Sequence, residues 1–202
     1  MTRNLYLASQ SPRRLELLRQ VGLSPTVLPL RVTIGRADVD ETPYPDEPGA
    51  DYVLRLAHTK AESAARVLNA RDLPSWPILA ADTTVTLDGQ IMGKPRDEAE
   101  ARVMLKGCSG RMHRVFTGVA VAHSGHIQTA LSESQVTFRL LSDEEISAYI
   151  ASGEPFDKAG GYGIQGRAAI FIEHLTGSYS GVMGLPLFET AELLKSAGFA
   201  CL

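Results

Sequence analysis

The stretch that decides the fold is Ile78-Leu79-Ala80-Ala81-Asp82-Thr83-Thr84-Val85-Thr86-Leu87-Asp88-Gly89. Its first four residues are an apolar run typical of a buried strand, and this run ends at Asp82. The chain continues extended from Thr83 to Leu87, and Asp88-Gly89 favours a two-residue hairpin turn. The stretch thus predicts a buried strand that meets a carboxylate and leads into a hairpin.

Two helices are expected before this strand. Ser11-Pro12 marks the start of the first, which should run to about Val21 and stop at Gly22. The second should run from Ala50 to about Asn69, where residues recur at three-and-four spacing. The members of that stripe are Val53, Leu56, Ala57, Lys60, Ala61, Ala64 and Leu68, and Lys60 is its one charged member.

Strands and further helices complete the expected set. The strands are Leu5–Ala8, Leu23–Ile34 (broken up by two prolines), Met112–Ala122, His126–Leu140 and Ala168–Glu173. The helices are one capped by Asp97 that reaches about Lys106, one opened by the capping box of Ser142 and Glu145, and one at Pro186–Ala197. Helices together with long antiparallel pairs predict an α/β fold, with a mixed twisted sheet flanked by helices.

Length and composition indicate an ordinary globular protein. The 202 residues fit one domain, 1–202, and 44% of them are hydrophobic and 21% charged. The formal net charge of -3 gives no global basic field, so neither nucleic acid nor an anionic membrane is an expected partner. Any phosphate site must therefore be a local cluster of cations.

Cysteine content and hydropathy indicate the compartment. Cys108 and Cys201 alone cannot form a disulfide framework or a four-ligand zinc site, which favours a reducing compartment. The first residues are too short an apolar run for a signal peptide, and no run of about 18 apolar residues predicts a membrane span. A cytoplasmic location is expected by elimination.

Three residues are candidates for a catalytic or anion-binding site. Asp82 follows an apolar strand, where ligand sites of α/β sheets gather, although an aspartate that merely forms a turn is the alternative. Lys60 on a buried stripe must extend to solvent, pair with a carboxylate or face a polar cleft. Lys94, between Gly93 and Pro95, is either a site residue or a solvated loop lysine.

The start of the first helix is a candidate phosphate site. Arg13 and Arg14 lie in its first turn, where the helix dipole already favours an anion and two guanidinium groups suggest a negative ligand. Ser9 and Ser11 add hydroxyl donors to the same turn. A solvated basic face is the alternative.

Glu41, within the acidic loop Asp38-Val39-Asp40-Glu41, is a candidate metal ligand. Its carboxylate could join Asp82 in holding a hard divalent cation, which prefers oxygen ligands and bridges phosphates. An acidic surface loop is an equally simple interpretation.

A glycine-rich segment at 161–166 matches G-x-G-x-x-G but does not predict a dinucleotide site. It precedes a strand-like run, whereas that motif must follow a strand and open a helix. We interpret it as a mobile loop in which Gln165 presents an amide suited to the edge of a base. His113, His123 and His126 are expected to be ordinary strand or surface residues.

Ordered blocks along the chain resemble the Maf family of nucleotide pyrophosphatases. The blocks are Leu7-Ala8-Ser9-Gln10-Ser11-Pro12-Arg13-Arg14, Asp40-Glu41-Thr42-Pro43, Ala80-Ala81-Asp82-Thr83, Gly93-Lys94-Pro95, Ser109-Gly110-Arg111 with His113, Thr117-Gly118-Val119, and Asp157-Lys158-Ala159-Gly160-Gly161-Tyr162-Gly163-Ile164-Gln165-Gly166. The resemblance implies a fold related to the inosine triphosphate pyrophosphatases, a homodimer, and a cleft between two lobes that takes a nucleoside triphosphate with a divalent cation, Mg or Mn.

The resemblance also implies roles for individual residues. Asp82 would be the proton acceptor, and positions matching the phosphate and metal site are Ser9, Arg13, Glu41, Lys60 and Lys94. Arg13, Thr83 and Gln165 match the branch that acts on dTTP and UTP rather than on methylated GTP. The expected reaction is hydrolysis to the monophosphate and pyrophosphate. A nucleotide-binding regulator of septum formation, and an enzyme for modified nucleotides, are the alternatives.

Overall fold

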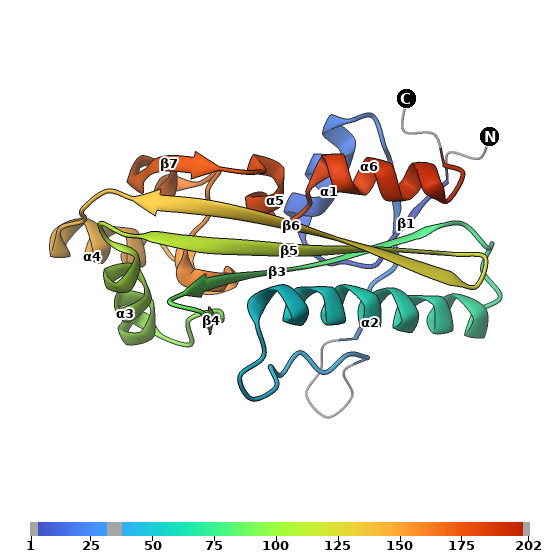
Figure 1. Cartoon of the computed structure of the whole chain (residues 1–202), viewed down its shortest axis with the longest axis horizontal. Coiled ribbons are helices and arrows are strands. Elements are labelled where there is room, and N and C mark those ends of the chain that lie inside the picture. Colours follow the sequence, from blue (N-terminus) through green and yellow to red (C-terminus); the bar gives the residue numbers. More distant parts are fainter. Residues whose placement is uncertain (1–3, 32–37, 200–202) are drawn as a thin grey trace.

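The computed structural model describes residues 4–31 and 38–199 (Figure 1). The strands are β1 (Tyr6–Leu7), β2 (Thr26–Val27), β3 (Ile78–Leu87), β4 (Gln90–Met92), β5 (Met112–His123), β6 (His126–Phe138) and β7 (Ile172–Thr176). The α-helices are α1 (Pro12–Gln20), α2 (Gly49–Ala70), α3 (Glu98–Cys108), α4 (Asp143–Ala151), α5 (Tyr179–Met183) and α6 (Leu187–Ser196). Three 3-10 helices, η1 (Glu154–Asp157), η2 (Ala159–Gly161) and η3 (Arg167–Phe171), lie between α4 and β7.

The strands form one mixed sheet. Its order is β2-β1-β3-β5-β6-β7, with β4 paired to β3. β1 is parallel to both β2 and β3, and the other pairs are antiparallel. In Figure 1, β3, β5 and β6 run along the long axis, with α2 below them and α1 and α6 above. The expected α/β fold with a mixed sheet and flanking helices is confirmed.

β3 does not end at Asp82, contrary to the sequence-based expectation. It runs on to Leu87 and pairs with β5 from Ile78 to Thr86. The residues after Asp82 are mostly threonine and valine, whose β-branched side chains favour strands, so the polarity of Asp82 does not stop the strand. The interpretation of Asp82 as a turn residue is therefore wrong, and so is its placement at a strand end.

The other edge of β3 is interrupted beside Asp82. β1 pairs with β3 only as far as Leu79, and β4 begins to pair at Val85. Between these two positions no described strand covers this edge. The gap opens the sheet at Asp82 and Thr83, so a ligand can approach β3 from the side.

Successive β3 side chains point to opposite faces of the sheet. Ile78 and Ala80 pack in the cluster that contains the second half of the apolar stripe of α2, from Ala57 to Leu68, whereas Leu79 and Ala81 pack against residues of α1 and α6. A third cluster joins α3 and α4 to the far end of the sheet. By this alternation the side chain of Asp82 faces α2, and that of Thr83 faces the α1 side.

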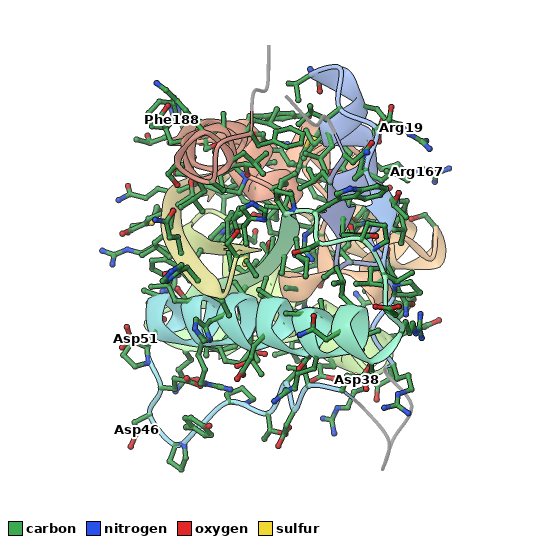
Figure 2. The ribbon with its side chains drawn as sticks, turned by 90° about the vertical axis from the view of Figure 1, so that its right-hand side faces the viewer. Arg19, Asp38, Asp46, Asp51, Arg167 and Phe188 are labelled. Carbon is green, nitrogen blue, oxygen red and sulfur yellow. The ribbon has the colours of Figure 1, made fainter. Side chains whose placement is uncertain are left out.

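The α2 prediction is confirmed, including its stripe. Every apolar member is at most 5% exposed, and Lys60 lies among them. Figure 2 shows the segment that carries Asp38 and Asp46 on the side of α2 away from the sheet. α2 is therefore sandwiched between the sheet and the acidic loop that contains Glu41.

Several local predictions are confirmed because their signals are short-range. Asp88 and Gly89 both have positive φ in the turn between β3 and β4. Asp97 accepts a hydrogen bond from the Glu100 amide at the start of α3. Ser142 and Glu145 form the expected capping box at the start of α4. Cys108 is buried. No described helix is long and apolar enough to cross a bilayer.

Other boundaries differ from prediction. The strand expected at Ala168–Glu173 begins only at Ile172, because residues 167–171 form η3. Ala168 and Phe171 are both buried, and their separation of three residues is the spacing of a 3-10 turn. Of the strand expected at Leu23–Ile34, only β2 forms, and residues 32–34 lie outside the described ranges. Helix α5 was not expected from the sequence.

Candidate active site

A pocket of about 1210 Å³ lies beside the gap in the sheet. It is lined by the β1–α1 connection, the loop before α2, the middle of β3, the end of the β3–β4 hairpin, and residues 157–165 and 182–184. Every residue that the sequence marked as a site candidate lines it: Ser9, Arg13, Arg14, Glu41, Lys60, Asp82, Thr83, Lys94 and Gln165. Because the gap joins the two sheet faces, one pocket reaches both Asp82 and Thr83.

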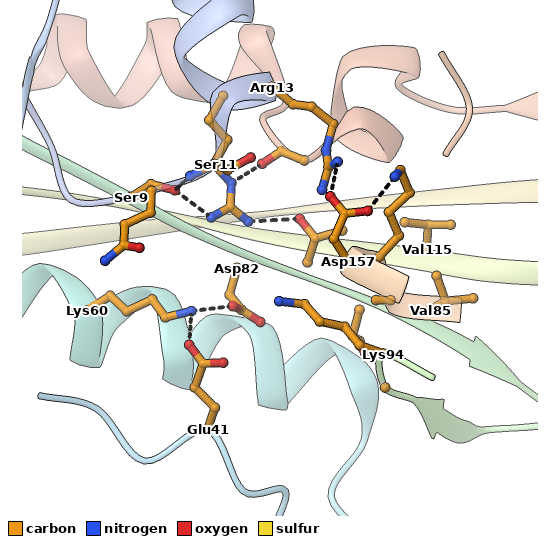
Figure 3. A pocket seen from close by; sticks show the side chains of 18 of the residues that line it. Ser9, Ser11, Arg13, Glu41, Lys60, Asp82, Val85, Lys94, Val115 and Asp157 are labelled. Atoms are coloured by element: carbon orange, nitrogen blue, oxygen red, sulfur yellow. Dashed lines mark hydrogen bonds and ion pairs between the residues drawn. The ribbon is translucent and has the colours of Figure 1, made fainter. Parts of the chain in front are cut away.

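Lys60 lies between two carboxylates (Figure 3). Its Nζ is 2.6 Å from Asp82 Oδ1 and 2.6 Å from Glu41 Oε1. The side chains of Lys60 and Asp82 are only 13% and 11% exposed. Of the three outcomes open to a lysine on a buried stripe, pairing in a polar cleft is the one observed.

The carboxylates of Glu41 and Asp82 fit a hard divalent cation. One oxygen of each contacts the Lys60 ammonium, and the second oxygen of each makes no hydrogen bond to a described residue. Burial raises the pKa of Glu41, but the charge and hydrogen bond of Lys60 outweigh it, so the pKa lies below its ordinary value and Glu41 is ionised. Among the described residues, no group of three or more His, Cys, Asp or Glu side chains is placed to hold a metal ion.

Arg14 organises the opposite wall of the pocket. Its three nitrogens donate to Gly184 O (2.7 Å), Ser9 Oγ (3.2 Å) and Thr83 Oγ1 (3.3 Å). Burial lowers the pKa of Arg14, and Asp82 partly offsets this effect. Thr83 Oγ1 also lies 3.0 Å from Thr117 Oγ1 on β5, so the threonine is fixed from two sides. Arg14 thus holds Ser9 and Thr83 in place.

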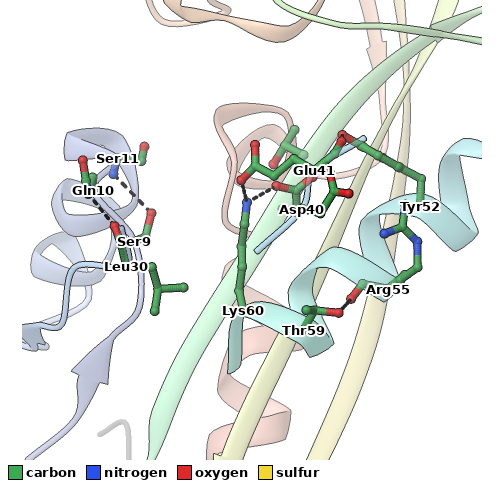
Figure 4. A network of polar contacts seen from close by, with 12 residues as sticks. Ser9, Gln10, Ser11, Leu30, Asp40, Glu41, Tyr52, Arg55, Thr59 and Lys60 are labelled. Atoms are coloured by element: carbon green, nitrogen blue, oxygen red, sulfur yellow. Dashed lines mark hydrogen bonds and ion pairs between the residues drawn. The ribbon is translucent and has the colours of Figure 1, made fainter. Parts of the chain in front are cut away.

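Arg13 extends from the first turn of α1 to the mouth of the pocket. Its Nη1 is 3.1 Å from Asp157 Oδ2, and Lys158 Nζ contacts the other oxygen of the same carboxylate (Figure 3). Ser9 Oγ accepts a hydrogen bond from the Ser11 amide (Figure 4). The turn before α1 therefore presents hydroxyl and guanidinium donors, as its sequence predicts.

Lys94, after the β3–β4 hairpin, and Gln165, in the glycine-rich segment, are the remaining site candidates that line the pocket. Both are exposed, and Figure 3 shows the Lys94 side chain extending toward Asp82. The glycine-rich segment is more buried than expected, since residues 160–164 are all buried. Tyr162 belongs to the core, where its hydroxyl lies 2.8 Å from Nε2 of His113 on β5.

Sequence reasoning missed two residues of the pocket wall, Asp157 and Tyr52. It also missed Thr117, which does not line the pocket but contacts Thr83. The hydroxyl of Tyr52 on α2 donates to Glu41 O at 2.9 Å (Figure 4). Asp157 and Thr117 stood inside two of the quoted sequence blocks, but their contacts are with residues far along the chain. Only Tyr52 had a local signal, because it lies on α2 two turns before Lys60.

The chain is similar to curated bacterial proteins along almost its whole length. It is 56% identical over 197 residues to a dTTP/UTP pyrophosphatase of Aromatoleum aromaticum, covering 96% of each chain. It is 54% identical to proteins of the same name from Nitrosomonas europaea, covering 97% of this chain and 95% of that one, and from Dechloromonas aromatica, covering 96% and 98%.

Two solved structures resemble part of the chain. A HAM1 protein from Coxiella burnetii matches with a TM-score of 0.41 and 16% identity, covering 67% of this chain and 72% of that one. The Staphylococcus aureus Ham1 protein matches with a TM-score of 0.44 and 16% identity, covering 69% and 72%. The sequence matches the family described as Maf-like protein over residues 4–197. Because that match and the relatives span nearly all of the sequence, the chain belongs to the Maf family.

Proposed function

We propose that this protein hydrolyses dTTP and UTP to the nucleoside monophosphate and pyrophosphate. The observation that carries the proposal is a buried carboxylate, Asp82, in a pocket where Lys60, Lys94, Arg13 and Arg14 gather. The relatives at 54–56% identity are named for this activity.

Asp82 acts as the proton acceptor for the attacking water. Hydrolysis between the α and β phosphates needs a water in line with the pyrophosphate leaving group and cations at the transferring oxygens. Lys60 fixes the Asp82 carboxylate from one oxygen, which leaves the other to orient and deprotonate the water. Lys60, Lys94 and Arg13 offset the charge of the phosphates, and Ser9 adds a hydroxyl donor.

Glu41 and Asp82 are the residues that would hold a divalent cation, Mg²⁺ or Mn²⁺. Such an ion, when bound, neutralises phosphate charge and polarises the phosphoryl group. The chain contributes the placement of both carboxylates, since Lys60 holds one oxygen of each.

Base selection is assigned to Thr83 and Gln165. Thr83 is held rigidly by Arg14 and Thr117, whereas Gln165 is exposed at the pocket wall. A site that pairs with defined polar groups discriminates against an analogue that leaves them unpaired.

We further propose that the protein is a cytoplasmic homodimer with no nucleic-acid or membrane partner.

A substrate panel tests the proposal. Pyrophosphate release is measured with dTTP, UTP, CTP, GTP and methylated GTP, with Mg²⁺ or Mn²⁺ and with neither. We expect many turnovers on dTTP and UTP and a requirement for the cation. A regulator that only binds nucleotide would release at most one pyrophosphate per chain, and a preference for a purine would refute the base assignment.

Asp82→Asn tests the catalytic role. Loss of a proton acceptor typically costs about 10² to 10⁴ in rate, so turnover should fall by that factor while nucleotide binding by calorimetry persists. Asp88→Asn is the matched control, because Asp88 lies in the hairpin turn at the end of the same strand, outside the pocket. Wild-type turnover in Asp82→Asn contradicts the assignment.

A further inference from the structure

The mouth of the pocket contains a carboxylate that bonds two cations. Asp157 Oδ2 is 3.1 Å from Arg13 Nη1, and Asp157 Oδ1 is 2.5 Å from Lys158 Nζ. Arg13 comes from α1, whereas Asp157 ends η1, 144 residues later. The Arg13–Asp157 ion pair therefore joins two distant segments of the pocket wall, whereas the Lys158–Asp157 pair lies within one of them.

The exposure of the three side chains shows how they are layered. The Asp157 side chain is 64% exposed, whereas those of Arg13 and Lys158 are 25% and 13% exposed. Lys158 is also anchored by a hydrogen bond to Glu154 O at 2.8 Å. The cations are thus part of the wall, and the carboxylate lies over them on the solvent side.

A carboxylate with one cation on each oxygen has the contacts that a phosphate group would make at the same cations. Burial raises the pKa of Asp157, but the hydrogen bonds from Lys158 and Arg13 outweigh it, so the pKa lies below its ordinary value. Asp157 is therefore charged at neutral pH, and a phosphate arriving at Arg13 and Lys158 meets an occupied and like-charged position.

We propose that Asp157 is an internal competitor of the phosphate anion, whose carboxylate occupies Arg13 and Lys158 until a polyphosphate displaces it. Asp157 then weakens binding of both substrate and the pyrophosphate product, which favours release of that product. The inference takes from the proposed function only that this pocket binds phosphate anions. Lys158 becomes a phosphate ligand alongside Arg13.

Calorimetric titration of the full chain with inorganic pyrophosphate and Mg²⁺ tests the inference. Asp157→Asn should bind pyrophosphate about two- to fivefold more tightly than the wild type, because a partly exposed ion pair is worth roughly that factor. Asp157→Glu keeps the charge and should bind like the wild type. Product inhibition of dTTP hydrolysis by pyrophosphate should strengthen in Asp157→Asn by the same factor.

Asp143→Asn is the matched control. Its carboxylate pairs with Lys106 Nζ at 2.6 Å, is 66% exposed and lies outside the pocket, so the same substitution breaks a similar pair elsewhere. It should leave pyrophosphate binding unchanged. Equal or weaker binding by Asp157→Asn overturns the inference. Absence of dTTP turnover in the wild type would instead refute the proposed function, while the pyrophosphate titration would still decide the role of Asp157.

Discussion

Gly118 on β5 lies directly opposite Asp82 in the pairing with β3. A Cβ at Gly118 would overlap the carbonyl oxygen of Val53 on α2. The missing side chain therefore allows the α2 backbone to lie against the sheet at the level of Asp82. This close approach is what lets Lys60, two helical turns after Val53, contact Asp82 at 2.6 Å.

Gly118→Ala should therefore damage both stability and turnover. The added methyl group must push α2 from the sheet, and overpacking of this kind typically costs about 1–3 kcal/mol. Turnover should fall more than the unfolded fraction explains, because Lys60 and Glu41 move with α2. Urea unfolding and dTTP hydrolysis measure the two effects. Gly93→Ala is the control for stability and should leave the free energy of unfolding nearly unchanged, since a Cβ there meets nothing within 4 Å. An unchanged free energy of unfolding in Gly118→Ala would contradict this account.

Single residues were predictable to the extent that their signal was local. Lys60 broke the apolar stripe of its own helix, so spacing alone marked it as a candidate, and the ion pairs with Glu41 and Asp82 decide among its three possible outcomes. One of the three partners of Arg14 is the carbonyl of Gly184, 170 residues away, and nothing near Arg14 in the sequence indicates it. Likewise, Asp82 and Thr83 are adjacent in sequence but point to opposite faces, a consequence of β3 continuing through both.

At the scale of elements, α2 carries a second stripe beside its apolar one. Tyr52 Oη donates to Glu41 O at 2.9 Å, Arg55 contacts Glu47 through two nitrogens at 2.6 Å each, and Ser63 Oγ donates to Asp38 O at 3.1 Å. These donors attach an exposed loop without regular structure to a rigid helix. The stripe thus fixes Glu41 at the entrance of the pocket.

Tyr52→Phe should weaken binding of the divalent cation. Burial raises the pKa of Tyr52, and Asp82 and Glu41 add to it, so the hydroxyl is a donor at neutral pH. Loss of one such hydrogen bond is worth about three- to tenfold, which should appear as weaker Mn²⁺ binding by electron paramagnetic resonance and a higher Mn²⁺ requirement for turnover. Tyr44→Phe removes the same atom from the exposed loop itself and should have little effect. Equal Mn²⁺ binding by both variants would exclude the positioning role.

Element boundaries show where sequence reasoning stops. α2 and the β5–β6 hairpin carry long periodic patterns or turn dipeptides, so they were expected within one or two residues. The run at 168–173 is short and apolar, and such a run suits a strand and a 3-10 turn equally. Tertiary packing of Ala168 and Phe171 decides between them.

For the molecule as a whole, His113 makes stability depend on pH. It is 1% exposed within a cluster of Phe138 and Tyr162, and burial lowers its pKa to about 4, against a small opposing effect of the Arg111 backbone. Its ordinary value of 6.5 applies in the unfolded chain, which therefore binds a proton more readily than the folded protein. Stability should be retained above about pH 6.5 and decline as the pH falls toward 4, by at most about 3 kcal/mol from this group.

Urea unfolding between pH 7.5 and 4.5 measures this decline. His113→Gln keeps a hydrogen-bonding group near Tyr162 but does not titrate there, so its free energy of unfolding should vary less with pH than that of the wild type. His174→Gln, at an exposed position on β7, should retain the wild-type slope. If His113→Gln and the wild type have parallel pH profiles, the buried histidine is not the cause.

The overall architecture followed from the sequence, but the opening in the sheet did not. The pattern of helices and antiparallel pairs was enough to predict an α/β protein with a mixed sheet. The gap depends on β1 ending at Leu7 and β4 ending at Met92 in a particular register against β3, and register is set by pairing between segments.

That gap also affects the main chain. Leu79 O accepts a hydrogen bond from the Ala8 amide, so by alternation the amides and carbonyls of Ala81 and Thr83 face the same edge, beyond the end of β1. Every amino acid except proline supplies these two groups. A nucleotide that used them would keep its contacts through any substitution at Ala81 or Thr83 that leaves the strand intact. Only an insertion or deletion that lengthened β1 or β4 would remove them, by extending the ladder across the opening.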